Sequence, residues 1–289
     1  MESNFLTAVF LPLALFVIMF GMGLGLTPRD FLRVWVEPKA MLLGLGAQLV
    51  VLPILGFLLA QVFPLSPELA IGVMILAACP GGPTSNSIVY LIRGNVALSI
   101  SLTAISSLVT VFTIPLIVNF ATQQFAGTAV ALELPFGTTV VQIAAITIVP
   151  VALGMTVYHF APELAARIEK SVKWLSLAFL GLIIVGLLAK ERENLPGFFA
   201  QVGAVTLALN LLAMGLGYGL AQVARLSDAS AKSISVEVGI QNGTLAIAVA
   251  STLLNEPTMA IPAAIYSLLM FVTSGAFAWI LSRGDRAVT

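Results

Sequence analysis

The sequence predicts an all-α polytopic membrane protein, and three observations support this prediction. Of its 289 residues, 59% are hydrophobic and only 9% are charged, whereas a soluble domain has about 25% charged residues. The mean hydropathy is +1.07. Apolar runs of about 20 residues, the length that crosses a bilayer core as a helix, recur along the whole chain. The short alternating segments of an outer-membrane barrel do not occur.

The apolar runs divide into nine predicted transmembrane helices within a single domain of residues 1–289. Each run is separated from the next by Pro, Gly, polar or charged residues. An odd number of crossings places the two termini on opposite sides of the bilayer. The predicted spans are 5–26, 38–62, 67–92, 95–120, 136–160, 171–190, 196–224, 227–254 and 257–282.

The Lys and Arg residues indicate the orientation of these helices. Eleven of the 13 fall on one side and only Lys190 and Arg192 on the other, and cytoplasmic loops carry the excess of basic residues. The N-terminus is therefore expected outside and the C-terminus in the cytoplasm, in the cell inner (plasma) membrane. Lys173 is counted among the cytoplasmic residues. No Lys or Arg is expected within a span to balance a bound anion. The zero net charge gives no indication of a nucleic-acid partner.

Two of the nine spans are interrupted near their middle. The third reaches Cys79 and then meets the Pro- and Gly-rich segment 80–87, and the eighth reaches Glu237 and then meets 239–244. Backbone opened at membrane depth survives only where it lines a cavity or is buried in protein. The two spans are five apart in order and so cross in opposite directions. This spacing predicts two inverted repeats, of which the first lacks its opening helix.

Glu237 is the only charged residue that lies deep inside an apolar stretch. A carboxylate at this depth is costly unless it is compensated, so it marks a functional site. Oxygen atoms near the two breaks would form a cage for a small hard cation such as Na⁺. The candidate ligands are Gln48, Ser85, Asn86, Ser99, Thr103, Glu237 and Gln241. Asn210 lies outside the breaks and is expected to hold neighbouring helices together.

The motifs at the two breaks resemble those of the bile acid:sodium symporter family. Residues 79–86 (CPGGPTSN) with 93–99 (RGNVALS) are similar to that family's first crossover, and 237–242 (EVGIQN) to its second. The segment from Phe20 to Phe31 resembles its early helix, so the resemblance covers nearly the whole chain. The chain is most similar to bacterial, nine-helix forms. Pro83 departs from the pattern, because bacterial relatives often carry a hydroxyl residue there, and it removes an N–H that could contact a substrate.

The resemblance implies a panel domain beside a core domain that holds two crossing broken helices. The core would comprise about 38–120 and 196–282, and the panel 5–26, 136–160 and 171–190. The resemblance also implies two Na⁺ ions that share Glu237. The first site would use Ser85, Asn86, Ser99, Thr103 and Glu237. The second would use Gln48, Glu237, Gln241 and the backbone carbonyls of Val238 and Ile240.

The resemblance and the charge balance together predict a sodium-coupled secondary active symporter that imports a monovalent organic anion by alternating access. Two Na⁺ ions and one carboxylate leave a surplus of about one positive charge, and the N-terminal dipoles of the second half-helices add to it. The anion is expected to be a small carboxylate rather than a bile acid. Its predicted contacts are Thr84, Asn242, Gly243 and Thr244, while Glu237 would hold sodium without touching the substrate.

Three alternatives remain open from the sequence. Glu237 could carry a proton, which would make the protein a proton-coupled transporter of organic anions. A passive channel or sensor would use the same helices without a gradient. An intramembrane enzyme is disfavoured, because one His, one Cys and one buried carboxylate supply neither a nucleophile with its base nor a metal triad.

Overall fold

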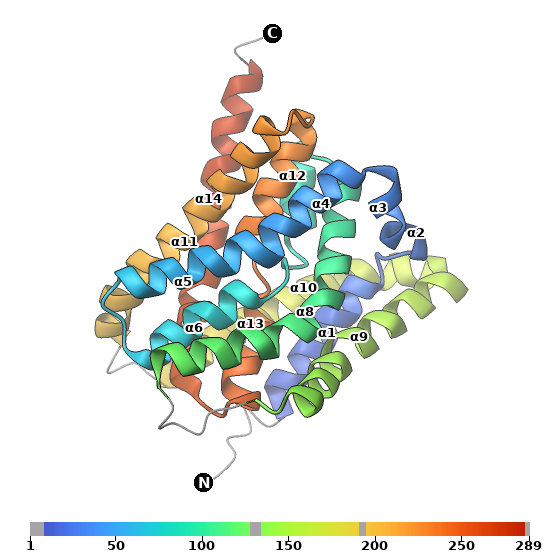
Figure 1. Ribbon diagram of the computed structural model, residues 1–289. Helices are drawn as coiled ribbons and strands as arrows, with labels where there is room; N and C mark the ends of the chain where they lie inside the picture. Colours follow the sequence, from blue (N-terminus) through green and yellow to red (C-terminus); the bar gives the residue numbers. More distant parts are fainter. Residues whose placement is uncertain (1–8, 128–133, 191–194, 287–289) are drawn as a thin grey trace.

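The computed structural model describes residues 9–127, 134–190 and 195–286, and within them the regular elements are helices, with one isolated β-bridge (Figure 1). Six helices are long and apolar enough to cross a membrane: Pro38–Val62, Val96–Phe125, Phe136–Phe160, Pro162–Leu187, Pro196–Val223 and Pro257–Ile280. Three further apolar helices are shorter: Leu11–Gly23, Pro67–Ala78 and Gly243–Leu253. The all-helical, multi-span fold is thus confirmed. The number of nine crossings stays a prediction.

The described chain opens with α1 (Leu11–Gly23) and two single-turn helices, α2 (Pro28–Phe31) and α3 (Arg33–Val36). The next long helix contains a wider turn, because α4 (Pro38–Gly46) and α5 (Leu52–Val62) are joined by the π-helical segment η2 (Ala47–Val51). Pro53 explains this turn, since it has no N–H to donate to the preceding turn and its ring clashes with the carbonyl there. Gln48 lies within the widened turn.

The third predicted span is a broken helix, as the sequence indicated. α6 (Pro67–Ala78) ends just before Pro80, and α7 (Ser85–Leu91) begins after an extended stretch. α8 (Val96–Phe125) follows, with the side chain of Asn95 accepting a hydrogen bond from the N–H of Leu98 (3.0 Å) as its N-cap. In the first half-helix, Pro67 is the first residue of α6 and Pro80 follows just after its end, positions that suit proline at a helix start and beyond a helix end.

α9 (Phe136–Phe160) and α10 (Pro162–Lys190) form the next pair of long helices. α10 begins nine residues before the predicted span 171–190, since Pro162 is well suited to the first turn of a helix. Both helices contact α1, as Figure 1 shows for α9. A Cβ on Gly23 of α1 would lie 2.2 Å from the backbone oxygen of Val151 in α9, so these helices approach at backbone distance.

The second half of the chain repeats the order long helix, broken helix, long helix. It comprises α11 (Leu195–Val223), α12 (Asp228–Gly239), α13 (Gly243–Ala248) with the π-helical η3 (Val249–Leu253), the 3₁₀ turn η4 (Pro257–Ala260) and α14 (Ile261–Arg286). α11 packs against both α12 and α14. Every residue from Ser230 to Ser251 is buried, so the second broken helix runs through the core of the protein.

Candidate functional site

The two breaks pair with each other through their backbones. The N–H of Gly82 donates to the carbonyl of Ile240 (2.7 Å). The N–H of Asn242 donates to the carbonyl of Pro80 (3.0 Å), and together these bonds form the antiparallel bridge. They satisfy backbone groups that the interrupted helices leave open. Around this bridge α7 contacts α12 and α6 contacts α13, so the two broken helices pack against each other at their breaks.

Gly81 lies directly against the carboxylate of Glu237. A Cβ at this position would stand 2.1 Å from Oε1 of Glu237 and 2.8 Å from its Cδ. Real Cβ atoms do not approach other heavy atoms so closely, so only glycine fits here. The glycine-rich first break therefore makes room for the carboxylate of the second broken helix.

Three hydroxyl groups hold the Glu237 carboxylate, which is 1% exposed. Oε2 accepts hydrogen bonds from Ser85 at the start of α7 (2.8 Å) and from Ser99 of α8 (2.8 Å). Oε1 accepts one from Thr103 of α8. The predicted spacing of Ser99 and Thr103 on one helix face is thus confirmed. Within the described ranges no Lys, Arg or His lies within ion-pair distance of Glu237, so hydroxyl donors compensate its burial.

Gln48 and Gln241 form a second polar cluster across the two breaks. Nε2 of Gln48 donates to the carbonyl of Cys79 (2.9 Å) and to Oε1 of Gln241 (2.8 Å). Nε2 of Gln241 donates to the carbonyl of Val238 (2.6 Å). Oε1 of Gln48 is buried and has no hydrogen-bond partner within the described chain, which leaves a free acceptor beside the break. A π-helical turn frequently accompanies such a functional position.

The structure brings only part of the predicted ion ligands into direct contact. Asn86 does not bond to Glu237, and its buried Oδ1 has no hydrogen-bond partner in the described part of the chain. Gln48 and Gln241 bond to each other and form no hydrogen bond with Glu237. The carbonyl of Ile240 accepts from Gly82 of the first break. Ser85, Ser99 and Thr103 thus surround Glu237, and the two glutamines form a neighbouring cluster.

Asn210 of α11 joins helices as expected, and its hydrogen bonds fall at the end of α12, next to the second break. Its Nδ2 donates to the carbonyl of Gly239 (2.7 Å) and to the hydroxyl oxygen of Tyr266 (3.2 Å). The hydroxyl of Tyr266, a fully buried residue of α14, donates to the same carbonyl (2.8 Å). Two flanking helices therefore hold the last carbonyl of α12 in place. Tyr266 was missed in the sequence because its partner lies 27 residues away.

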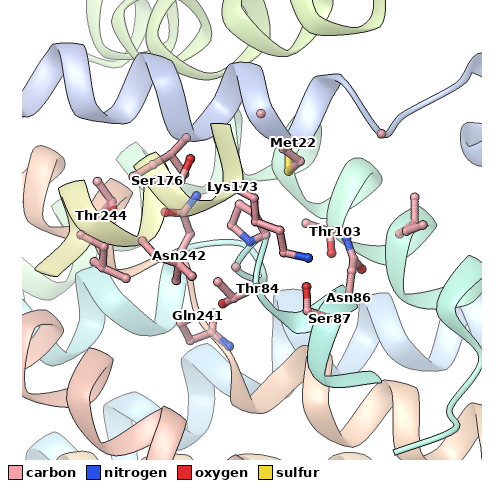
Figure 2. A pocket seen from close by; sticks show the side chains of 18 of the residues that line it. Met22, Thr84, Asn86, Ser87, Thr103, Lys173, Ser176, Gln241, Asn242 and Thr244 are labelled. Atoms are coloured by element: carbon pink, nitrogen blue, oxygen red, sulfur yellow. The ribbon is translucent and has the colours of Figure 1, made fainter. Parts of the chain in front are cut away.

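A pocket of about 520 Å³ lies between the paired breaks and the helices α1 and α10. All four residues predicted to contact substrate line it: Thr84, Asn242, Gly243 and Thr244. The predicted ion ligands Asn86, Thr103 and Gln241 also reach its wall, whereas Glu237 is not among the described residues that line it. Figure 2 shows side chains of both breaks facing the pocket from one side and side chains of α10 from another. Pro83 is part of the wall.

Lys173 also lines this pocket, which corrects the prediction that no Lys or Arg of a span is available to an anion. It lies within Pro162–Leu187, one of the helices that are long and apolar enough to cross a membrane, and it faces the pocket. Glu169 and Ser176, roughly one turn away on either side, line the pocket as well. Their spacing of four and three residues on one helix face was the available signal.

Comparison with known proteins identifies the family to which this chain belongs. The profile of the Sodium Bile acid symporter family matches residues 12–197. The uncharacterized sodium-dependent transporter YocS of Bacillus subtilis (strain 168) is 31% identical over 256 residues, which cover 87% of this chain and 76% of that protein.

Two eukaryotic relatives extend the comparison. The probable sodium/metabolite cotransporter BASS1, chloroplastic, of Oryza sativa subsp. japonica is 30% identical over 91% of this chain and 63% of its own length. The human ileal sodium/bile acid cotransporter is 29% identical over 84% of this chain and 71% of its own length. With its paired helix breaks and this match, the chain belongs to the sodium bile acid symporter family and is a sodium-dependent membrane transporter rather than an enzyme.

Proposed function

We propose that this protein is a sodium-coupled secondary active symporter that imports a small organic carboxylate by alternating access. The observation that carries the proposal is the position of Glu237. Its buried carboxylate stands where two broken helices meet, and the same breaks line a pocket large enough for an organic ligand. The two relatives named as sodium cotransporters for a metabolite and for bile acid support the coupling ion and an organic substrate.

Two Na⁺ ions would bind beside Glu237. The first would take oxygens of Ser85, Asn86, Ser99 and Thr103 together with the carboxylate. The second would take Gln48, Gln241, Glu237 and the carbonyls of Val238 and Ile240. Hydroxyl, amide, carbonyl and carboxylate oxygens suit a hard cation, and the free acceptors on Gln48 and Asn86 support their inclusion.

Sodium binding would create the substrate site. Thr103 and Gln241 belong to the proposed ion ligands and also line the pocket. An ion that draws these side chains together would change the wall against which the substrate docks, at Thr84 and at 242–244. The affinity of each ligand would then rise when the other binds, because such coupling is reciprocal.

Alternating access would rest on motion of a panel (α1, α9 and α10) against a core (α4–α8 and α11–α14). The contacts of α1 with both α9 and α10 support the grouping.

Nine crossings and inverted repeats are supported by the repeated helix order. The repeats are also supported by the backbone: Arg93 and Asn255 both have a positive φ of 56°, and each follows the second half-helix of its broken helix. The pocket reaches Tyr90 and Lys173, on the side that the positive-inside count predicts to be cytoplasmic, so this conformation would face inward.

The test is uptake into proteoliposomes. The purified protein is first screened for thermal stabilisation by keto, hydroxy and simple carboxylic acids in NaCl or KCl, and the stabilising acid is then used as labelled substrate. We expect uptake that saturates, accumulates the acid against its gradient and requires an inward Na⁺ gradient. Uptake that proceeds unchanged in KCl at neutral pH would overturn the proposal.

Proton coupling through Glu237 is a second candidate, favoured by the absence of a basic partner for this carboxylate in the described part of the chain. Glu237→Gln separates the two mechanisms. Sodium coupling predicts that this variant loses Na⁺-dependent stabilisation and transport. Proton coupling predicts that it loses accumulation yet still exchanges the anion across the membrane without a gradient.

A further inference from the structure

Lys173 is the only Lys or Arg among the described residues that line the pocket. It lies on α10, on a different wall from the residues of the two breaks. Figure 2 shows its side chain extending from α10 into the pocket, towards the side on which Asn86 and Thr103 lie. A cation in this position adds one positive charge to a site that already attracts an anion.

The ammonium group of Lys173 forms no ion pair with another described residue. The ion pairs formed by the described residues join Arg33 to Glu37 and Lys232 to Asp228, and neither involves Lys173. Glu169, four residues earlier on α10, lines the pocket too. An exposed pair at this spacing changes an affinity by only about a factor of two. Lys173 is therefore free to bind a ligand.

We propose that Lys173 forms a second anion-binding subsite, so that the substrate carries an acidic group at each end, as a dicarboxylate does. The inference rests on the proposed function, which assigns the first acidic group to Thr84 and 242–244. Glu169 also lines the pocket and offsets one charge, so the second acidic group is assigned from the position of Lys173 on a different wall from the breaks and not from the total charge. A divalent anion would replace the monovalent one expected from the sequence. Such a ligand connects α10 to the breaks and favours closure of the panel on the core.

The test compares acids of equal chain length: butyrate with succinate, valerate with glutarate, and hexanoate with adipate. Affinities are measured in NaCl by thermal stabilisation of the wild-type protein and of Lys173→Met, Lys173→Arg and Glu169→Gln. Lys170→Met is the matched control, because Lys170 is an exposed lysine of the same helix outside the pocket. The melting temperature without ligand and the affinity for the monoacids report whether each variant is folded.

We expect wild type to bind at least one diacid about 10- to 100-fold more tightly than its monoacid, as one charged hydrogen bond provides. Lys173→Met should remove this difference and leave the monoacid unchanged. Lys173→Arg should keep most of it, Lys170→Met all of it, and Glu169→Gln should raise it about twofold. Equal losses for both acids, or none, in Lys173→Met overturn the subsite. Sodium-dependent binding of monoacids without preference for diacids overturns the subsite but leaves the proposed function standing, whereas no sodium-dependent binding of any acid overturns both.

Discussion

Gly81→Ala tests whether the contact between the two breaks controls sodium binding. The substitution adds one methyl group to the first break and replaces none of the predicted ion ligands. That methyl carbon would stand 2.1 Å from Oε1 of Glu237. Ordinary contacts begin near 3.4 Å, so the carboxylate or the backbone has to move by roughly 1 Å.

The magnitude follows from the contacts that such a shift disturbs. The backbone on both sides of Gly81 is held by the hydrogen bonds of Pro80 and Gly82 to the second break, so the carboxylate is the part that yields. It would lose at least one of its three hydroxyl donors, and a hydrogen bond to a charged group contributes about 1.5–3 kcal/mol. Overpacking itself costs about 1–3 kcal/mol. We expect a loss of about 2.5–6 kcal/mol in stability and a drop of at least about 10-fold in Na⁺ affinity.

The assay is the melting temperature of the purified protein as a function of Na⁺ concentration, followed by uptake in proteoliposomes. Gly275→Ala is the matched control, because a Cβ on this glycine of α14 meets no atom within 4 Å. It should leave Na⁺ affinity and transport unchanged and stabilise the helix by about 0.5–1 kcal/mol. If Gly81→Ala binds Na⁺ and transports as wild type does, the argument that this glycine makes room for the ion-binding carboxylate is refuted.

Three further substitutions test the neighbouring contacts. Gln48→Met removes the free acceptor next to the second break. We expect the Hill coefficient for Na⁺ in uptake to fall from about two to about one, and an unchanged coefficient would contradict a role of Gln48 in ion binding. Ser99→Ala should lower Na⁺ affinity about 10-fold, measured by stabilisation in NaCl, whereas Ser101→Ala, whose hydroxyl bonds only within α8, should have no effect. Tyr266→Phe leaves the Gly239 carbonyl with one donor, so thermal unfolding should show a loss of about 0.5–1.5 kcal/mol in stability. Uptake should still require sodium; uptake that no longer requires it would show that the carbonyl acts in ion binding.

The two breaks illustrate how much of the site is readable from residues alone. Pro80 cannot continue a helix and the glycines next to it weaken one, while Gly239 and Gly243 bracket the second interruption, which identifies both breaks. Glu237 is identified by its cost in a bilayer. Ser99 and Thr103 follow from their spacing on one helix face. Their contact with Glu237 over more than 130 residues needed the family resemblance or the structure.

Other members of the site gave a weaker local signal or none. Tyr266 looks like an aromatic core residue, and its role depends on the position of a carbonyl in another helix. Lys173 looked like an interfacial charge, because a lysine near the end of an apolar run usually has its ammonium group at the membrane surface. Only the arrangement of α1 and α10 around the breaks shows that its helix face borders a pocket.

The sequence by itself determined the membrane-spanning helical fold, the positions of both helix breaks and the chemistry of the residues within them. These features depend on hydrophobicity, backbone stereochemistry and charge, which act over a few neighbouring residues. Tertiary structure alone decided which residues meet: the pairing of the breaks, the three hydroxyls on Glu237, the clamp on Gly239 and the position of Lys173 in the pocket. These contacts join helices that are distant in the chain, and their geometry follows from how whole helices pack rather than from local pattern.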